Sequence, residues 1–142
     1  MSRAGTLYVV GTPIGNLEDL SDRVRRVLSE VNVVAAEDTR TTGTLLKRLG
    51  ISARLTSLFE GNEHARVGPL VARLEAGETV AVVSECGTPT ISDPGGTLVT
   101  AAVAAGVAVV PVPGPSAVTT VLSACGLDVS RFRFEGFLPR KG

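Results

Sequence analysis

Five short segments rich in β-branched residues recur along the chain and constrain its fold more than any other feature. They cover residues 6–12, 31–37, 53–59, 78–84 and 107–112. Most of them are continuously apolar, which is typical of strands that are covered on both faces of a sheet. They therefore predict a mainly parallel, five-stranded sheet flanked by helices.

Helical patterns fill the intervals between these segments. Apolar residues follow helical spacing over 20–31, 67–74, 98–103 and 117–125, and a weaker helix is expected over 39–49. Side chains suited to N-caps occur at Ser21 or Asp22, Asp38, Ser92 or Asp93 close to Pro94, and Ser116. Strands that alternate with helices along the chain define the α/β fold class.

Four polar loops rich in glycine or proline follow strands of this predicted sheet. They are GTPIGN (11–16), EDTRTTG (37–43), VSECGTPTISDPGG (83–96) and PVPGPSA (111–117). In parallel α/β sheets, ligands bind beyond the carboxyl ends of the strands, and all four loops would lie at that edge. The sequence therefore predicts one ligand site built from four separate loops.

Composition narrows the class of protein. The 142 residues are enough for one domain with a substantial core, and 14 basic residues balance 14 acidic ones, which excludes a strongly basic domain that coats nucleic acid. Cys86, Cys125 and His64 are too few for a disulfide framework or a dedicated metal site, so free thiols, no metal and a surface histidine are expected. No apolar run approaches the roughly 20 residues that cross a bilayer, and the amino-terminal stretch is too short for a signal peptide, so a cytoplasmic protein is expected.

The first two loops leave alternatives open. Pro13 breaks the GxGxxG dinucleotide fingerprint, and there is no phosphate-binding P-loop motif. However, Glu37 and Asp38 follow Gly15 at the distance at which dinucleotide folds place a ribose-binding acid, which favours a nicotinamide-binding oxidoreductase domain as an alternative. Asp38 as the N-cap of the helix at 39–49 is a structural alternative for that residue.

Taken together, five ordered motifs closely resemble the tetrapyrrole methylase superfamily. They are LYVVGTPIGNLEDLSDR, AAEDTRTTGTLL, VSECGTPTISDPGG, VPVPGPSAV and FEGFLPRKG, and the match runs from about Thr6 to Gly142. Within the superfamily they look like the branch that methylates a ribose 2′-hydroxyl of a cytidine in small-subunit (16S) ribosomal RNA. A methylase of a porphyrin-like precursor is the alternative within the superfamily, and GTPIGN and EDTR argue against it.

The resemblance implies S-adenosyl-L-methionine as methyl donor and a two-domain enzyme with the cofactor cleft between its domains. FEGFLPRKG matches the point where the family's chain crosses between domains. The resemblance thus implies an N-terminal α/β methylase domain at residues 1–136 and the start of a linker at 137–142, inactive without a C-terminal domain. It also implies ribosomal RNA or the 30S subunit as partner, and a homodimer of the full-length protein. A non-catalytic binding or dimerisation module is the remaining alternative for such a half.

The resemblance also carries over site residues. Those implied in cofactor binding are Thr12, Pro13, Ser84, Glu85, Cys86, Gly87, Thr88, Ser92, Asp93, Pro113, Ser116 and Ala117. Those implied at the substrate side are Glu37, Asp38, Thr39 and Arg40, of which Glu37 and Asp38 are candidates for the base that takes up the 2′-hydroxyl proton.

This chain departs from the family pattern in its own residues at two places. Relatives usually have Asp-Ala where this chain has Glu85-Cys86, and Phe59 stands where they have a histidine, although Glu60, Asn62 and Glu63 of that pattern are present.

Overall fold

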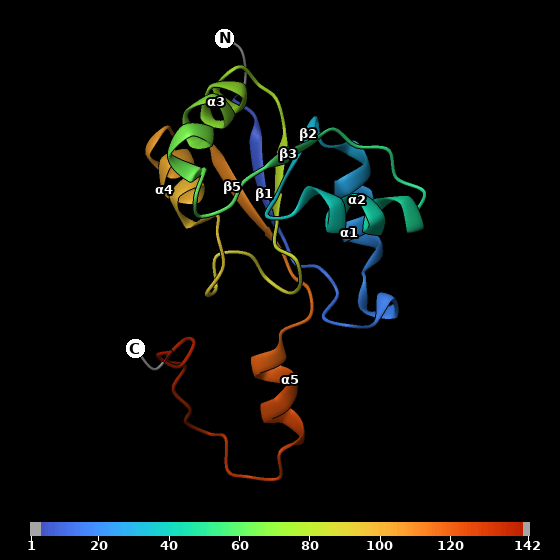
Figure 1. Cartoon of the computed structure of the whole chain (residues 1–142), viewed down its shortest axis with the longest axis vertical. Coiled ribbons are helices and arrows are strands. Elements are labelled where there is room, and N and C mark those ends of the chain that lie inside the picture. The colour runs from blue at the N-terminus through green and yellow to red at the C-terminus, as the bar shows by residue number, and fades with distance from the viewer. Residues whose placement is uncertain (1–3, 141–142) are drawn as a thin grey trace.

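A parallel five-stranded sheet with the strand order β3-β2-β4-β1-β5 forms the centre of the molecule (Figure 1). The structure is a computed structural model that describes residues 4–140. The strands are β1 (Thr6–Val10), β2 (Val33–Ala36), β3 (Leu55–Ser57), β4 (Val80–Val83) and β5 (Ala108–Val112). All four residues of β2 and of β4 are buried, whereas the edge strands β3 and β5 are partly exposed. The predicted fold class and all five predicted strands are confirmed.

Helices cover both faces of the sheet. The helices are α1 (Asp22–Glu30), α2 (Thr39–Arg48), α3 (Glu63–Glu75), α4 (Gly96–Ala104) and α5 (Ala117–Ala124), with a 3-10 turn, η1, at Leu17–Asp19. On one face, Leu28 of α1 and Leu46 of α2 pack over the sheet; on the other, Leu74 of α3 and Leu98 of α4 do so. Figure 1 shows these two helical layers on opposite sides of the strands.

Local side-chain chemistry sets several helix boundaries. The Ser21 hydroxyl accepts a hydrogen bond from the Val24 amide at 3.1 Å and caps α1, and the Asp38 carboxylate accepts from the Arg40 amide at 2.8 Å and caps α2. Both residues are among the predicted caps. Because the caps occupy the first free amides of these helices, they hold the start of each helix directly after the loop that precedes it.

Other boundaries differ from the prediction. Neither Ser92 nor Asp93 caps α4: its N-cap is Gly95, in a left-handed conformation with φ 113°, which delays the helix beyond Pro94. Ser116 occupies the N-cap position of α5 but makes no capping hydrogen bond there. Helix α3 begins at Glu63, before the predicted start at 67. Its first turn is polar and carries no core residue, so the apolar spacing does not include it.

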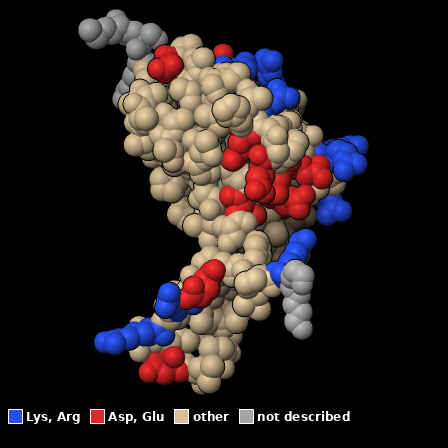
Figure 2. All heavy atoms as spheres, turned by 60° about the vertical axis from the view of Figure 1, so that its left-hand side comes forward, with Lys and Arg blue, Asp and Glu red and all other residues tan. Residues whose placement is uncertain are grey.

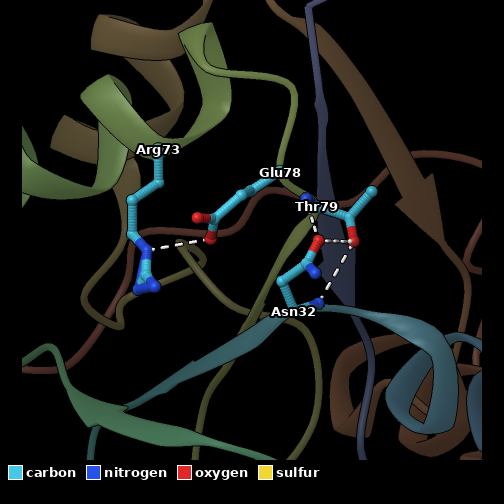
Figure 3. A network of polar contacts seen from close by, with 4 residues as sticks. All are labelled: Asn32, Arg73, Glu78 and Thr79. Carbon is cyan, nitrogen blue, oxygen red and sulfur yellow. Dashed lines mark hydrogen bonds and ion pairs between the residues drawn. The ribbon is translucent and has the colours of Figure 1, made fainter.

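A polar network fastens the amino ends of two central strands (Figure 3). The Asn32 side chain accepts from the amide and the hydroxyl of Thr79 at 2.8 and 2.9 Å, and Arg73 pairs with Glu78 at 2.9 Å. Asn32 precedes β2 and Thr79 precedes β4, so the network lies at the edge of the sheet opposite the four loops. The carboxyl edge is therefore left for the ligand site.

The segment after β5 projects from the body of the protein, and its end returns to it, since Phe137 and Arg140 line a cavity together with Ser92 and Asp93. Helix α5 contains no buried residue, and within the described chain residues 125–140 form neither helix nor strand (Figure 1). The predicted domain boundary at 136 stays a prediction, and residues 141–142 of the predicted linker lie outside the described residues. Within residues 4–140, none of the helices has the length and apolar character needed to cross a bilayer.

Candidate functional site

The four loops meet at one edge of the sheet, as the sequence predicts. The Thr12 amide donates to the Gly87 carbonyl at 3.0 Å, and the Gly87 amide returns a bond to the Thr12 carbonyl at 3.1 Å. Gly11 and Gly114 lie back to back, since a Cβ added at Gly114 would come within 2.9 Å of the Gly11 backbone. Glycine is required at this crossing because only two backbones without Cβ atoms can approach so closely.

Thr12 and Ser84 are buried, and their hydroxyls hold the loops from inside. The Thr12 hydroxyl lies 3.4 Å from the carbonyls of Ser84 and Gly87, and the Ser84 hydroxyl donates to the Gly87 carbonyl at 3.2 Å. Thr12 is 2% exposed and Ser84 3% exposed. These two residues therefore shape the loops that a ligand would meet, and the surface they support is made by their neighbours.

The loop at 84–96 has an unusual backbone. Thr90 and Ser92 adopt positive φ angles of 72° and 58°, and Gly87 and Gly95 do so at 81° and 113°. A left-handed conformation costs a residue with a Cβ roughly 1–2 kcal/mol. Such strain persists only where surrounding contacts hold it, and it is frequent at functional sites.

Glu63 supplies a contact that stabilises this loop. Its carboxylate accepts from the Gly95 amide at 2.7 Å and from the Thr97 hydroxyl at 3.1 Å. Gly95 has no side chain to cap α4, and Glu63 of α3 instead holds the N-cap residue through its amide and the first turn through Thr97. Asn62 fixes the turn before α3, where its side chain accepts from the Phe59 amide at 2.8 Å. The sequence motif includes Glu63, but it does not predict the bond of Glu63 to Gly95, which lies 32 positions away.

Acidic side chains gather beside this loop (Figure 2). A cavity of about 700 Å³ is lined by Glu37, Glu60, Glu63 and Asp93, among others. Burial is the largest cause that raises the pKa of Glu37, and the charges of Asp93 and Glu85 raise it further. Burial also raises the pKa of Asp93. The arrangement concentrates negative charge in one place, which favours a positively charged ligand group.

Asp38 differs from its neighbour Glu37. Hydrogen bonds from the Arg40 and Thr41 amides lower its pKa, and Arg40 lies 3.7 Å away. The carboxylate is thus occupied as a helix cap and is the weaker base of the two. Thr39 is half-buried and Arg40 is exposed at the start of α2.

A second cavity, of about 510 Å³, lies between the first loop and α2. Its wall includes Pro13, Ser84 and Glu85 from the predicted cofactor residues, whereas Ser92 and Asp93 line the acidic cavity. The predicted cofactor residues are therefore divided between two cavities.

The remaining predicted cofactor residues fall outside both cavities. Of these, Cys86 and Thr88 are exposed on the loop, Gly87 is buried, and Pro113, Ser116 and Ala117 follow β5. Cys86 and Cys125 are free and exposed, and His64 is exposed. Across residues 4–140, no group of three or more His, Cys, Asp or Glu side chains is placed to hold a metal ion.

Comparison with known proteins defines the class of protein that has this fold and this candidate site. A family profile described as tetrapyrrole (corrin/porphyrin) methylases matches residues 6–139. The chain belongs to this family.

Individual relatives are more specific. The chain is 53% identical over 137 residues to ribosomal RNA small subunit methyltransferase I of Escherichia coli O157:H7, covering 96% of this chain and 48% of that protein. It is 55% identical over 138 residues to the protein of the same name from Pseudomonas aeruginosa PAO1, covering 97% and 49%. The chain thus spans about half the length of these relatives. Among solved structures it is similar to uroporphyrin-III-C-methyltransferase from Thermus thermophilus, with a TM-score of 0.65 and 29% identity over 89% of this chain and 54% of that one.

Proposed function

We propose that this chain forms the first half of an S-adenosylmethionine-dependent methyltransferase that methylates the ribose 2′-oxygen of a cytidine in small-subunit ribosomal RNA. The observation that carries the proposal is the 53–55% identity to ribosomal RNA methyltransferases over nearly the whole chain. The 29% identity to a uroporphyrin methyltransferase is much lower, which favours the RNA substrate over a porphyrin-like one.

The acidic cavity suits the methyl donor. S-Adenosylmethionine, when bound, supplies a methyl group carried on a positively charged sulfonium. Glu37 and Asp93 have raised pKa values because they are partly buried, with other carboxylates near Glu37. A cation bound beside Asp93 would relieve that repulsion, so Asp93 and Ser92 are the residues we expect near the sulfonium, with Glu37 left for the substrate side. The strained loop that holds Ser92 and Asp93 orients the site.

Glu37 is the better candidate for the base. A carboxylate accepts the proton of a 2′-hydroxyl more readily when its pKa lies above the ordinary range, closer to the working pH. The pKa of Glu37 is raised by burial and neighbouring charges despite an opposing backbone hydrogen bond from Glu85, whereas Asp38 is held by two amides and has a lowered pKa. The engagement of Asp38 as a helix cap also removes it as the ribose ligand that a nicotinamide-binding domain would need.

Further features of the full-length protein belong to the same proposal. The absence of buried residues in α5 is consistent with a partner surface supplied by a C-terminal domain and by a second subunit. We therefore propose a homodimer, and a cytoplasmic location because the substrate would be ribosomal RNA or the 30S subunit. By itself this chain is expected to be inactive.

Calorimetry and methyl transfer test the proposal. S-Adenosylhomocysteine should bind the full-length protein, NAD should not, and labelled methyl groups should appear on a cytidine ribose of 30S subunits. Removal of the carboxylate charge in Asp93→Asn should weaken cofactor binding, while the same neutralisation at the distant Asp128→Asn should not. Binding of NAD without S-adenosylhomocysteine would overturn the proposal.

A further inference from the structure

We propose that the 510 Å³ cavity between the first loop and α2 binds a ribose-phosphate unit of the RNA substrate, with Arg48 contacting the phosphate. This inference rests on the proposed function and extends it to the route by which the RNA reaches the site. None of the residues implied at the substrate side by the family resemblance, Glu37 to Arg40, lines this cavity.

The position of the cavity connects it to the reaction site. One side is formed by Pro13, Ser84 and Glu85, which lie on the loops that follow β1 and β4. Glu85 is also close enough to Glu37 to raise the pKa of Glu37. A nucleotide held in the cavity would therefore contact Glu85, a residue whose charge acts on the proposed base.

Helix α2 presents a separate face to this cavity. Thr41, Thr44, Leu45 and Arg48 line it, at the i, i+3, i+4 and i+7 spacing of a single helical face. Thr42, which is buried, also lines the cavity, whereas Leu46, the residue of α2 that packs in the core, does not. Thr41, Thr44 and Arg48 are exposed at this face and are therefore available to a ligand.

The cavity is lined by the groups that a nucleotide needs. Arg48 is exposed and, among residues 4–140, forms no ion pair, so its guanidinium is available to a phosphate. The Thr44 hydroxyl donates to the Arg40 carbonyl at 3.0 Å and can still accept from a ribose hydroxyl, as can that of Thr41, and Leu17 and Leu45 offer apolar surface to a sugar or base. A volume of about 510 Å³ falls within the range of small-ligand sites, roughly 300–1,000 Å³.

Electrostatics favours this cavity over the acidic one for the RNA backbone. The acidic cavity presents Glu37, Glu60, Glu63 and Asp93, which would repel a phosphate, against Arg140 as the one basic residue in its lining. In the cavity at α2, Glu85 is the one acid in the lining and Arg48 opposes it. The two cavities can therefore separate a cationic cofactor from an anionic substrate.

Arg48→Ala in the full-length protein tests the inference, with Lys47→Ala as the matched control. Lys47 has the same charge, lies on the same helix and is exposed, but does not line the cavity. Arg48→Ala should raise the KM for 30S subunits or ribosomal RNA about tenfold, as expected for one charge-assisted bond. It should also reduce the slope of log affinity against log salt by about 0.7–0.9, and leave the affinity for S-adenosylhomocysteine unchanged. Lys47→Ala should change the KM for 30S subunits or ribosomal RNA, and the salt slope, much less.

A second variant, Thr44→Val, keeps the shape of the side chain and should raise the KM for RNA severalfold without altering cofactor affinity. Loss of cofactor affinity in Arg48→Ala with unchanged RNA binding would make the cavity part of the cofactor site and overturn the inference. Equal effects of Arg48→Ala and Lys47→Ala would also overturn it, since a general positive surface would then suffice. If the unmodified protein transfers no methyl group to ribosomal RNA, the proposed function itself fails.

Discussion

Removal of the Glu63 side chain should release the start of α4 and, with it, the loop at 84–96. The Gly95 amide is buried and donates to Glu63 at 2.7 Å, and the Thr97 hydroxyl donates to the same carboxylate at 3.1 Å. A buried amide left without an acceptor costs about 1–3 kcal/mol, and the exposed hydroxyl bond adds about 0.5 kcal/mol. We expect Glu63→Ala to lower the free energy of unfolding by about 2–3 kcal/mol.

That loss should be visible in thermal and urea unfolding of this chain. With an unfolding entropy near 2.1 cal/mol/K per residue, about 2–3 kcal/mol lowers the Tm of 142 residues by about 7–10 °C. Glu63→Gln keeps an oxygen that can accept from Gly95, so it should lose about half as much. Glu60→Ala is the matched control, because Glu60 lines the same cavity and, in the part of the chain that the structure describes, makes no side-chain hydrogen bond.

The loop contact also has a functional consequence. Because Glu63 holds the N-cap residue of α4 two positions after Asp93, its removal should weaken S-adenosylhomocysteine binding even at a temperature where the variant is fully folded. If the free energies of unfolding of Glu63→Ala and Glu60→Ala differ by less than about 0.5 kcal/mol, the Glu63 contact does not stabilise the fold and the reasoning is refuted.

Three further predictions concern the base, the loop thiol and the C-terminal segment. The raised pKa of Glu37 means that the folded state binds this proton more tightly than the unfolded state, so ionised Glu37 destabilises the fold above that pKa. Glu37→Gln should therefore raise the urea midpoint at pH 7, with a gain that vanishes as the pH falls below the ordinary carboxyl range, while methyl transfer drops about 10²–10⁴-fold. Cys86 and Cys125 are both exposed, but only Cys86 is on the loop that carries Ser92 and Asp93, so S-adenosylhomocysteine should slow the alkylation of Cys86 and not of Cys125 in the full-length protein, as mass spectrometry of the modified peptides would show; equal rates would contradict this. Deletion of residues 117–142 should leave the unfolding free energy of this chain within about 1 kcal/mol, because α5 buries no residue; a larger loss in urea unfolding would contradict this.

The strands could be predicted from the sequence because their environment is simple. β2 and β4 are buried along their whole length and read as continuous apolar runs, so composition alone identified them. The loops could be predicted to meet because all parallel strands end at the same edge. Caps formed by the next residues in sequence, such as Asp38, were also within reach of pattern reasoning.

What could not be predicted depends on contacts between distant segments. The N-cap residue of α4 is Gly95, held by Glu63 of another helix, whereas a search for local caps selected Ser92 and Asp93. The first turn of α3 faces the loop and not the core, so the helix predicted from hydrophobic periodicity begins too late in the sequence. The division of the predicted cofactor residues between two cavities likewise follows from the folded backbone, because positive φ angles at Thr90 and Ser92 turn the loop within a few residues.

Glu85, which stands where relatives of this chain usually have an aspartate, acts on groups of both cavities. It lines the cavity that contains Arg48, and its charge raises the pKa of Glu37, which lines the other. In our proposal it therefore strengthens Glu37 as a base and opposes Arg48, so that the phosphate must compete with Glu85 for the guanidinium. A net charge of zero does not argue against RNA as substrate, because the separation of charge at this edge decides where the RNA can lie.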